Sequence, residues 1–152
     1  MHLFYDANHA SNKVKRRSQT GILIFCNRSP IMWFSKRQNS VKTSTFGSEF
    51  NALNHAAEMV NALQYKLRIP GVPIKGPTYM FCDNKAVYNK FSIPESVILK
   101  KHHRIAYHMC REAVAVRIFR IAKEYIETNL ADIFTKVLPR PRREQFLNFF
   151  TY

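Results

Sequence analysis

Hydrophobic residues follow two different periods along this chain, and the change of period divides it into strands and helices. Short runs rich in β-branched and aromatic residues predict five strands. The runs lie at 2–6, 21–26, 31–35, 78–83 and 118–122. A turn at 27–30 separates the second run from the third, so these two strands are expected to form a hairpin.

Apolar positions recur at helical spacing in other segments. The clearest is 45–67, where Leu53, Val60 and Leu67 belong to one apolar stripe. Further helices are predicted at 84–91, 102–115, 129–138 and 143–150, with Pro139 and Pro141 ending the one that begins at 129. This order of elements indicates an α/β architecture with a mixed (α+β) sheet. The chain shows no repeat or internal boundary, so its 152 residues are expected to form one domain.

Four carboxylates stand in apolar surroundings, where an isolated charge is costly unless it is paired or metal-bound. Asp6 ends the first predicted strand and Asp83 ends the fourth. Glu49 lies on the buried stripe of the long helix, whereas Glu58 falls off that stripe and is expected to be a surface acid. Asp132 lies in the first turn of the predicted helix at 129–138.

Each of these acids also has an ordinary structural explanation. Asp6 and Asp83 can close their strands and cap the next element of the chain, and Asp132 stands three residues after Asn129, the spacing of a capping box. Glu49 can pair with one of the many basic side chains. Together, however, two strand ends and two first turns of helices are positions at which an α/β sheet gathers functional groups.

The residue types of this quartet point to a particular metal chemistry. Four oxygen ligands without an accompanying Cys or His suit Mg²⁺ or Mn²⁺ better than zinc. Two such ions about 4 Å apart, shared by carboxylates, drive in-line phosphodiester hydrolysis. A two-metal site requires the four carboxyl groups to converge within roughly 4–8 Å. Glu58, Glu95 and Glu144 are expected to lie outside that cluster.

The charge balance indicates a polyanionic partner. The chain has 24 Lys and Arg against 10 Asp and Glu, a formal net charge of +14, and its apolar content of 46% favours a packed globule. Nucleic acid is the first choice of partner and an anionic membrane surface the second. No apolar run is long enough to span a membrane. Cys26, Cys82 and Cys110 lack any CxxC spacing and are expected to be buried free thiols.

The predicted helix at 102–115 has two distinct sides. Its apolar side is expected to comprise Ile105, Met109, Ala113 and Val116. Its basic side comprises Lys101, Arg104, His108 and Arg111, which we interpret as phosphate contacts or, alternatively, as a solvated face. If the stripe does not bind, the polar loops at 11–17 and 36–42 become the better binding surface. The basic run at 13–17 is either a nuclear address or part of a solvated loop.

Short motifs follow one another in order along nearly the whole chain. They are DANHA at 6–10, RSQTG at 17–21, WFSKRQ at 33–38, SEFNAL at 48–53, FCDN at 81–84, the helix from 101 to 112, and LADIFTK at 130–136. The CDN and LAD-x-x-TK motifs are the most specific. On these motifs the chain resembles the ribonuclease H domain of Ty1/copia-type retrotransposon Pol polyproteins, the RNase H associated with their reverse transcriptase.

This resemblance implies an RNase H-like fold, a five-stranded mixed sheet with helices on both faces. It also implies that the RNA strand of RNA–DNA hybrids is the substrate, and that Asp6, Glu49, Asp83 and Asp132 are both catalytic residues and ligands of two Mg²⁺ or Mn²⁺ ions. We expect Asp6, Glu49 and Asp83 to hold one ion, and Asp6 and Asp132 the other. The residues expected to contact nucleic acid are Lys101, Arg104, His108, Arg111, Lys36, Arg37 and Asn84.

The resemblance further implies a piece of a longer polyprotein, with a reverse transcriptase domain upstream. The expected location is intracellular, in cytoplasmic virus-like particles or in the nucleus. The main alternative is a catalytically inactive RNase H-like remnant that binds nucleic acid. A basic RNA-binding protein of ribosomal type leaves the four carboxylates unexplained.

Overall fold

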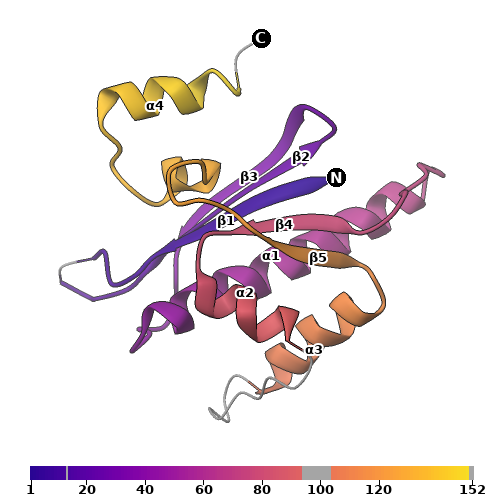
Figure 1. Cartoon of the computed structure of the whole chain (residues 1–152), viewed down its shortest axis with the longest axis horizontal. Helices are drawn as coiled ribbons and strands as arrows, with labels where there is room; N and C mark the ends of the chain where they lie inside the picture. Colours follow the sequence, from indigo (N-terminus) through magenta and orange to yellow (C-terminus); the bar gives the residue numbers. More distant parts are fainter. Residues whose placement is uncertain (13, 94–103, 151–152) are drawn as a thin grey trace.

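Five strands form one mixed sheet in the order β3-β2-β1-β4-β5 (Figure 1). The computed structural model describes residues 1–12, 14–93 and 104–150. The strands are β1 (His2–Asn8), β2 (Gln19–Cys26), β3 (Ser29–Arg37), β4 (Thr78–Cys82) and β5 (Phe119–Lys123). The central strand β1 pairs antiparallel with β2 and parallel with β4, and β2 and β3 form the predicted hairpin. The predicted five-stranded mixed sheet is therefore confirmed.

The sheet has a hydrophobic layer on each face, because successive side chains of a strand point to opposite sides. Leu3, Ile24 and Met80 pack on one side against α1 (Thr45–Arg68), α2 (Lys85–Ser92) and α3 (Arg104–Ala115). On the other side Leu23 and Phe25 pack against the 3₁₀ helix η2 (Leu130–Phe134) and against α4 (Arg140–Leu147). Figure 1 shows these two sets of helices on opposite faces of the sheet.

The long helix α1 matches the prediction closely. Ser44 is its N-cap, and the Ser44 hydroxyl accepts a hydrogen bond of 3.1 Å from the Gly47 amide. Its buried stripe includes Leu53 and Val60 and packs against the sheet, and Glu49 lies on that stripe. Glu58 is exposed, as predicted. The helical period therefore turns one acid inward and the other toward solvent.

The predicted helix at 129–138 is wrong in type and length. The structure has a 3₁₀ helix that ends at Phe134, with the Thr135 amide donating to the Asp132 carbonyl at 3.1 Å. Val137, which the helical pattern placed on the apolar face, is fully exposed. The prolines also act differently: Pro139 is the N-cap of α4 and Pro141 lies in its first turn, where a missing N–H is tolerated. As a result α4 begins at Arg140, three residues earlier than predicted.

The predicted apolar face of α3 is also wrong. Ile105, Met109 and Val116 are exposed, and of the predicted set Ala113 alone is buried. The helix instead buries Tyr107, Cys110 and Ala113. The Tyr107 ring lies 5.2 Å from that of Phe91 in α2, between ring centroids, so the buried side of α3 includes this contact between the two helices. In the part of the chain that the structure describes, no helix meets the length and hydropathy needed to cross a membrane.

The three cysteines are free thiols, but Cys26 is exposed, which corrects the prediction that all three are buried. Burial raises the pKa of the Cys82 and Cys110 thiols to about 12. Because the thiolate is the reactive form, we expect iodoacetamide at pH 8 to alkylate Cys26 and to spare the other two until the chain is unfolded. Peptide mass spectrometry with and without denaturant measures this. Labelling of Cys110 at the rate of Cys26 in the folded chain would contradict the packing of α3.

Candidate metal centre

Three aspartates converge at one end of the central strands. In the parallel register of β1 and β4, Phe4 is the partner of Phe81, so two residues further along Asp6 comes beside Asp83. The helix η2 packs on β1 and adds Asp132. One carboxylate oxygen from each of the three residues lies within 4.8 Å of the others. These oxygens are therefore close enough to share a ligand.

Glu49 approaches the same cluster from α1. Its side chain is 6% exposed, and its Oε2 is buried without a hydrogen-bond partner in the described residues. Burial raises the pKa of Glu49 well above its usual value, and the charges of Asp6 and Asp83 raise it further. An unpaired carboxylate oxygen in such a setting is costly unless a cation satisfies it. The structure thus places Glu49 where the charges of Asp6 and Asp83 reach it, outside the group of three aspartates whose oxygens lie within 4.8 Å of one another. The catalytic role of all four acids stays a prediction.

The three aspartates are also disfavoured as charged groups. Burial is the largest cause that raises the pKa of Asp6, Asp83 and Asp132, and the negative charge of a neighbouring aspartate adds to it in each case. The Lys136 ammonium works in the opposite direction on all three. The cluster therefore holds more negative charge than its surroundings compensate.

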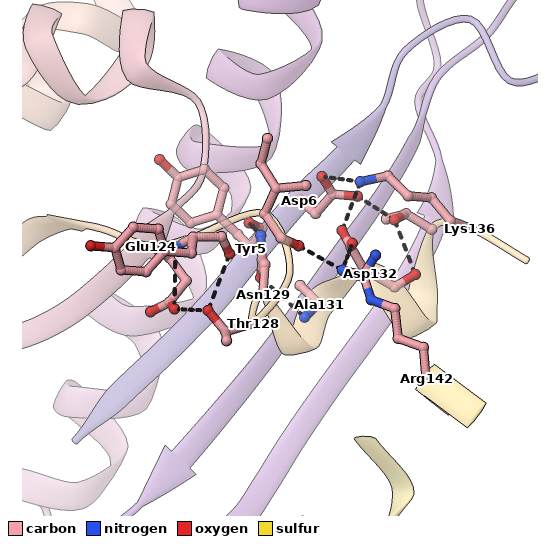
Figure 2. A network of polar contacts seen from close by, with 12 residues as sticks. Tyr5, Asp6, Glu124, Thr128, Asn129, Ala131, Asp132, Lys136 and Arg142 are labelled. Atoms are coloured by element: carbon pink, nitrogen blue, oxygen red, sulfur yellow. Dashed lines mark hydrogen bonds and ion pairs between the residues drawn. The ribbon is translucent and has the colours of Figure 1, made fainter. Parts of the chain in front are cut away.

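Two basic side chains reach into the cluster (Figure 2). The Lys136 Nζ lies 2.7 Å from Asp132 Oδ1 and 3.3 Å from Asp6 Oδ1. The Arg142 guanidinium lies 2.8 Å from the second oxygen of Asp132. Burial alone would lower the pKa of Lys136, but the charges of Asp6 and Asp132 outweigh it and raise that pKa. The carboxylate of Asp132 therefore faces these cations rather than capping its own helix.

Two neutral side chains fix the positions of the aspartates. The Thr135 hydroxyl donates a hydrogen bond to Asp6 Oδ2. The buried Asn129 donates from Nδ2 to the Tyr5 carbonyl at 3.1 Å, accepts from the Ala131 amide, and its side chain also hydrogen-bonds Asp83. The segment 129–135, which contains η2, thus contacts Tyr5 and Asp6 in the first strand and Asp83 after the fourth strand.

Gly21 allows η2 to lie this close to the sheet. It is the cross-strand partner of Asp6 in β2. A Cβ atom at this position would lie 2.8 Å from the Ala131 carbonyl oxygen and 2.7 Å from Thr135 Cγ2. Such distances are shorter than side chains tolerate, so the close approach depends on glycine.

Sequence reasoning missed four residues of this centre: Asn129, Thr135, Lys136 and Arg142. Thr135 and Lys136 belong to the LADIFTK motif, and Asn129 directly precedes it, so the motif itself was the available signal. Arg142 lies in a stretch of arginines and prolines, where nothing in the sequence distinguishes one arginine from the next.

The predicted nucleic-acid contacts on α3 differ from one another in the structure. Arg104 and His108 are exposed. Arg111 is partly buried, donates from Nη1 to the Tyr107 hydroxyl at 3.1 Å, and lies 5.7 Å from the centroid of that ring. Lys101 lies outside the described residues, as does Glu95, which was expected to lie outside the cluster. The prediction of a continuous basic stripe therefore rests on Arg104 and His108, with Arg111 engaged in packing.

The other predicted contacts lie on other elements. Lys36 and Arg37 are exposed at the end of β3 and line a hollow of about 210 Å³ together with His55. Asn84 follows Asp83 and caps α2, its Oδ1 accepting from the Ala86 amide at 3.0 Å. The role of these residues in binding stays a prediction.

Comparison with known proteins shows similarity to segments of transposon polyproteins. No family model matches the chain. The chain is 27% identical over 146 residues to the retrovirus-related Pol polyprotein from transposon RE1 of Arabidopsis thaliana, covering 96% of the chain and 10% of that protein. It is 29% identical over 141 residues to that from transposon TNT 1-94 of Nicotiana tabacum, covering 93% of the chain and 10% of that protein. The chain thus spans about a tenth of these relatives.

Solved structures show the same fold at low sequence identity. LC11-RNase H1 in complex with an RNA/DNA hybrid superposes with a TM-score of 0.67 at 12% identity, covering 88% of this chain and 92% of that one. RNase H1 from Halobacterium salinarum gives a TM-score of 0.64 at 14% identity, with coverage of 88% and 92%. The foamy viral protease-reverse transcriptase with an RNA/DNA hybrid gives 0.61 at 16% identity, covering 88% of this chain and 19% of that one. The predicted RNase H-like fold is confirmed.

Proposed function

Because the homologues of this chain are Ty1/copia-type retrovirus-related Pol polyproteins and its fold is that of ribonucleases H, we propose that it is a metal-dependent endonuclease acting on the RNA strand of RNA–DNA hybrids. The observation that carries the proposal is the cluster of Asp6, Asp83 and Asp132 together with Glu49 Oε2, which is buried without a hydrogen-bond partner among the residues that the structure describes. A nucleic-acid-binding protein of this net charge gains nothing electrostatically from four acids at one point.

The donor set fits divalent metal ions. All four side chains offer carboxylate oxygens, the ligands that Mg²⁺ and Mn²⁺ prefer, and the buried Oε2 of Glu49 calls for a cation. In this proposal Asp6, Glu49 and Asp83 hold one ion, and Asp6 and Asp132 hold a second. Bound there, the ions would activate a water molecule and stabilise the leaving 3′ oxygen.

The surrounding residues hold the ligands in place. Thr135 fixes one oxygen of Asp6, so that the other faces the cluster. Asn129 ties Asp83 to the backbone of β1 through Tyr5. Because Asp6 lies in the paired strand β1, Asp83 directly follows β4, and Asn129 is fully buried, the cluster is preorganised rather than assembled on binding.

The proposed substrate follows from the charge of the chain and from its structural neighbours. A net charge of +14 suits a polyanion, and two of the similar structures were solved with an RNA/DNA hybrid. Lys36, Arg37, Arg104, His108 and Asn84 are exposed or partly exposed candidates for backbone contacts. In the whole Pol polyprotein this segment would be one RNase H domain that works beside the polymerase domain, in cytoplasmic virus-like particles or the nucleus.

One observation favours the alternative, an inactive module that only binds nucleic acid: Lys136 and Arg142 neutralise Asp132 without any metal. Incubation of the chain with a labelled hybrid distinguishes the two. The endonuclease cleaves the RNA strand with Mg²⁺ and stops when EDTA is added. Binding of the hybrid without cleavage at any Mg²⁺ or Mn²⁺ concentration would support the inactive module.

Binding of the hybrid is expected to be sequence-tolerant and to weaken steeply with salt, because phosphate contacts carry no sequence information. Joint replacement of Lys101, Arg104 and Arg111 by Ala should reduce the slope of log K against log salt by about 0.7–0.9 for each phosphate that is no longer neutralised. Fluorescence anisotropy without Mg²⁺ measures the slope, and Lys75→Ala is the control for the loss of one exposed positive charge. An unchanged slope would move the binding surface to the loops at 11–17 and 36–42.

A further inference from the structure

The Lys136 side chain ends at the centre of the acidic cluster. Its ammonium bridges Asp132 Oδ1 at 2.7 Å and Asp6 Oδ1 at 3.3 Å. These carboxyl side chains are 1% and 2% exposed, whereas the lysine side chain is 34% exposed along its length. A lysine reaches from the surface to a pair of buried acids, and this pair is the one proposed above to hold the second ion.

An ammonium and a divalent cation cannot share these two oxygens. At a separation of a few ångströms like charges repel strongly in a partly buried site, and Asp6 Oδ2 is already engaged by Thr135. We propose that the Lys136 ammonium is a built-in competitor of the second metal ion, which binds between Asp6 and Asp132 when the lysine swings out. This inference rests on the proposed function and concerns the control of metal occupancy at the same centre.

The contacts of the two basic residues show which one can leave. Arg142 donates to the Ile126 carbonyl at 2.5 Å as well as to Asp132, and its guanidinium lies 5.2 Å from the Phe146 ring centroid. These contacts fix Arg142 to the protein whether or not Asp132 is occupied. In the described residues the Lys136 Nζ contacts the two carboxylates alone, at the end of a flexible four-carbon stem. Displacement of the Lys136 ammonium therefore breaks no further hydrogen bond to the residues that the structure describes.

The competitor has two measurable consequences. It compensates the repulsion among the acids when no metal is bound, and it weakens the binding of the second ion. Lys136→Met removes the charge while keeping a chain of similar length. At the second site, between Asp6 and Asp132, we expect this variant to bind Mn²⁺ on the order of tenfold more tightly than the wild-type chain does. We also expect a lower melting temperature in EDTA and a larger rise in that temperature when Mn²⁺ is added.

Isothermal titration calorimetry with Mn²⁺ on the wild type, Lys136→Met, Lys136→Arg and the exposed control Lys75→Met tests the proposal. Lys136→Arg retains the charge and should bind Mn²⁺ as weakly as the wild type, and Lys75→Met should not differ from it. Equal or weaker Mn²⁺ binding by Lys136→Met would overturn the competitor while leaving the proposed function intact. Absence of Mn²⁺ binding in both the wild type and Lys136→Met would overturn both.

A second measurement uses the wild-type chain and does not depend on whether the variant folds. Acetylation of lysines by an N-hydroxysuccinimide ester, followed by peptide mass spectrometry, reports the accessibility of each amine. Addition of Mg²⁺ should increase the acetylation rate of Lys136 several-fold and leave that of Lys75 unchanged. The decisive conditions are those in which calorimetry shows Mg²⁺ bound to the cluster. If the acetylation rate of Lys136 does not rise there, the ammonium stays in place and the proposal is wrong.

Discussion

Asp83→Asn is expected to abolish cleavage of a labelled RNA–DNA hybrid while leaving the metal-free chain as stable as the wild type or more stable. The pKa of Asp83 is raised, chiefly by burial and also by the charge of Asp132, so the charge is on balance disfavoured in the fold. The amide keeps the shape of the side chain but supplies a poor ligand for Mg²⁺. The gain in unfolding free energy should be small, up to about 1 kcal/mol, because the group is partly exposed.

Cleavage is measured by gel electrophoresis of the labelled RNA strand, and stability by urea unfolding in EDTA. Glu58→Gln is the matched control, because it removes one negative charge from an exposed site on α1 and should leave cleavage unchanged. If Asp83→Asn unfolds, the main role of this residue is to cap the end of β4. If it cleaves at the wild-type rate, the assignment of Asp83 as a metal ligand is wrong.

Gly21→Ala is expected to damage both stability and cleavage. The added methyl group would lie 2.7–2.9 Å from three atoms of the segment 131–135, including the Ala131 carbonyl oxygen. Relief of this clash moves η2 away from β2, at a cost of about 1–3 kcal/mol for overpacking. Because η2 carries Asp132, its shift also separates Asp132 from Asp6, so Mn²⁺ affinity and the cleavage rate should both fall.

Gly47→Ala provides the contrast for this experiment. A Cβ atom at Gly47 meets its nearest neighbour, Ser44 Oγ, at 3.4 Å, and alanine favours the helix by up to about 1 kcal/mol. Urea unfolding should therefore show Gly47→Ala to be neutral or stabilised and Gly21→Ala to be destabilised. A Gly21→Ala chain with wild-type stability and activity would contradict the close packing of η2 on β2.

The elements predicted correctly from the sequence are those whose hydrophobic residues all pack against one extended hydrophobic layer. The strands alternate against two hydrophobic layers, and α1 presents a long stripe to the sheet, so period alone locates them and turns Glu49 inward. The helix α3 carries apolar residues on two sides. The side that is buried carries Tyr107, which contacts Phe91 of α2, and no local pattern reports this contact.

The short helix η2 shows the same limit more strongly. Leu130, Ile133, Phe134 and Leu138 have α-helical spacing, yet the structure ends the helix at Phe134. The Thr135 hydroxyl is held by Asp6, and Gly21 permits contact with β2, so tertiary contacts determine the conformation of this segment. Local propensity is a weak guide where such contacts dominate.

The acids of the centre could be identified from the sequence because a charged residue is rare in apolar surroundings. The basic residues of the centre could not be identified in this way. Asp6, Glu49, Asp83 and Asp132 are four of only 10 acidic residues, and each stands beside a hydrophobic run. Lys136 and Arg142 are two of 24 basic residues, and most of those that the structure describes are exposed. Their partners are determined by the fold, which brings Lys136 to Asp6 across 130 positions of sequence.

That separation has a consequence for synthesis of the protein. Asp6 leaves the ribosome long before Thr135 and Lys136, because its contacts with them span 129 and 130 positions. A growing chain that ends after β5 already contains all five strands but has no complete acidic cluster. It also leaves Leu23 and Phe25 without Leu130 and Phe146, so an apolar sheet face is open to self-association. Emergence of the segment that follows β5 therefore both completes the centre and covers this apolar face.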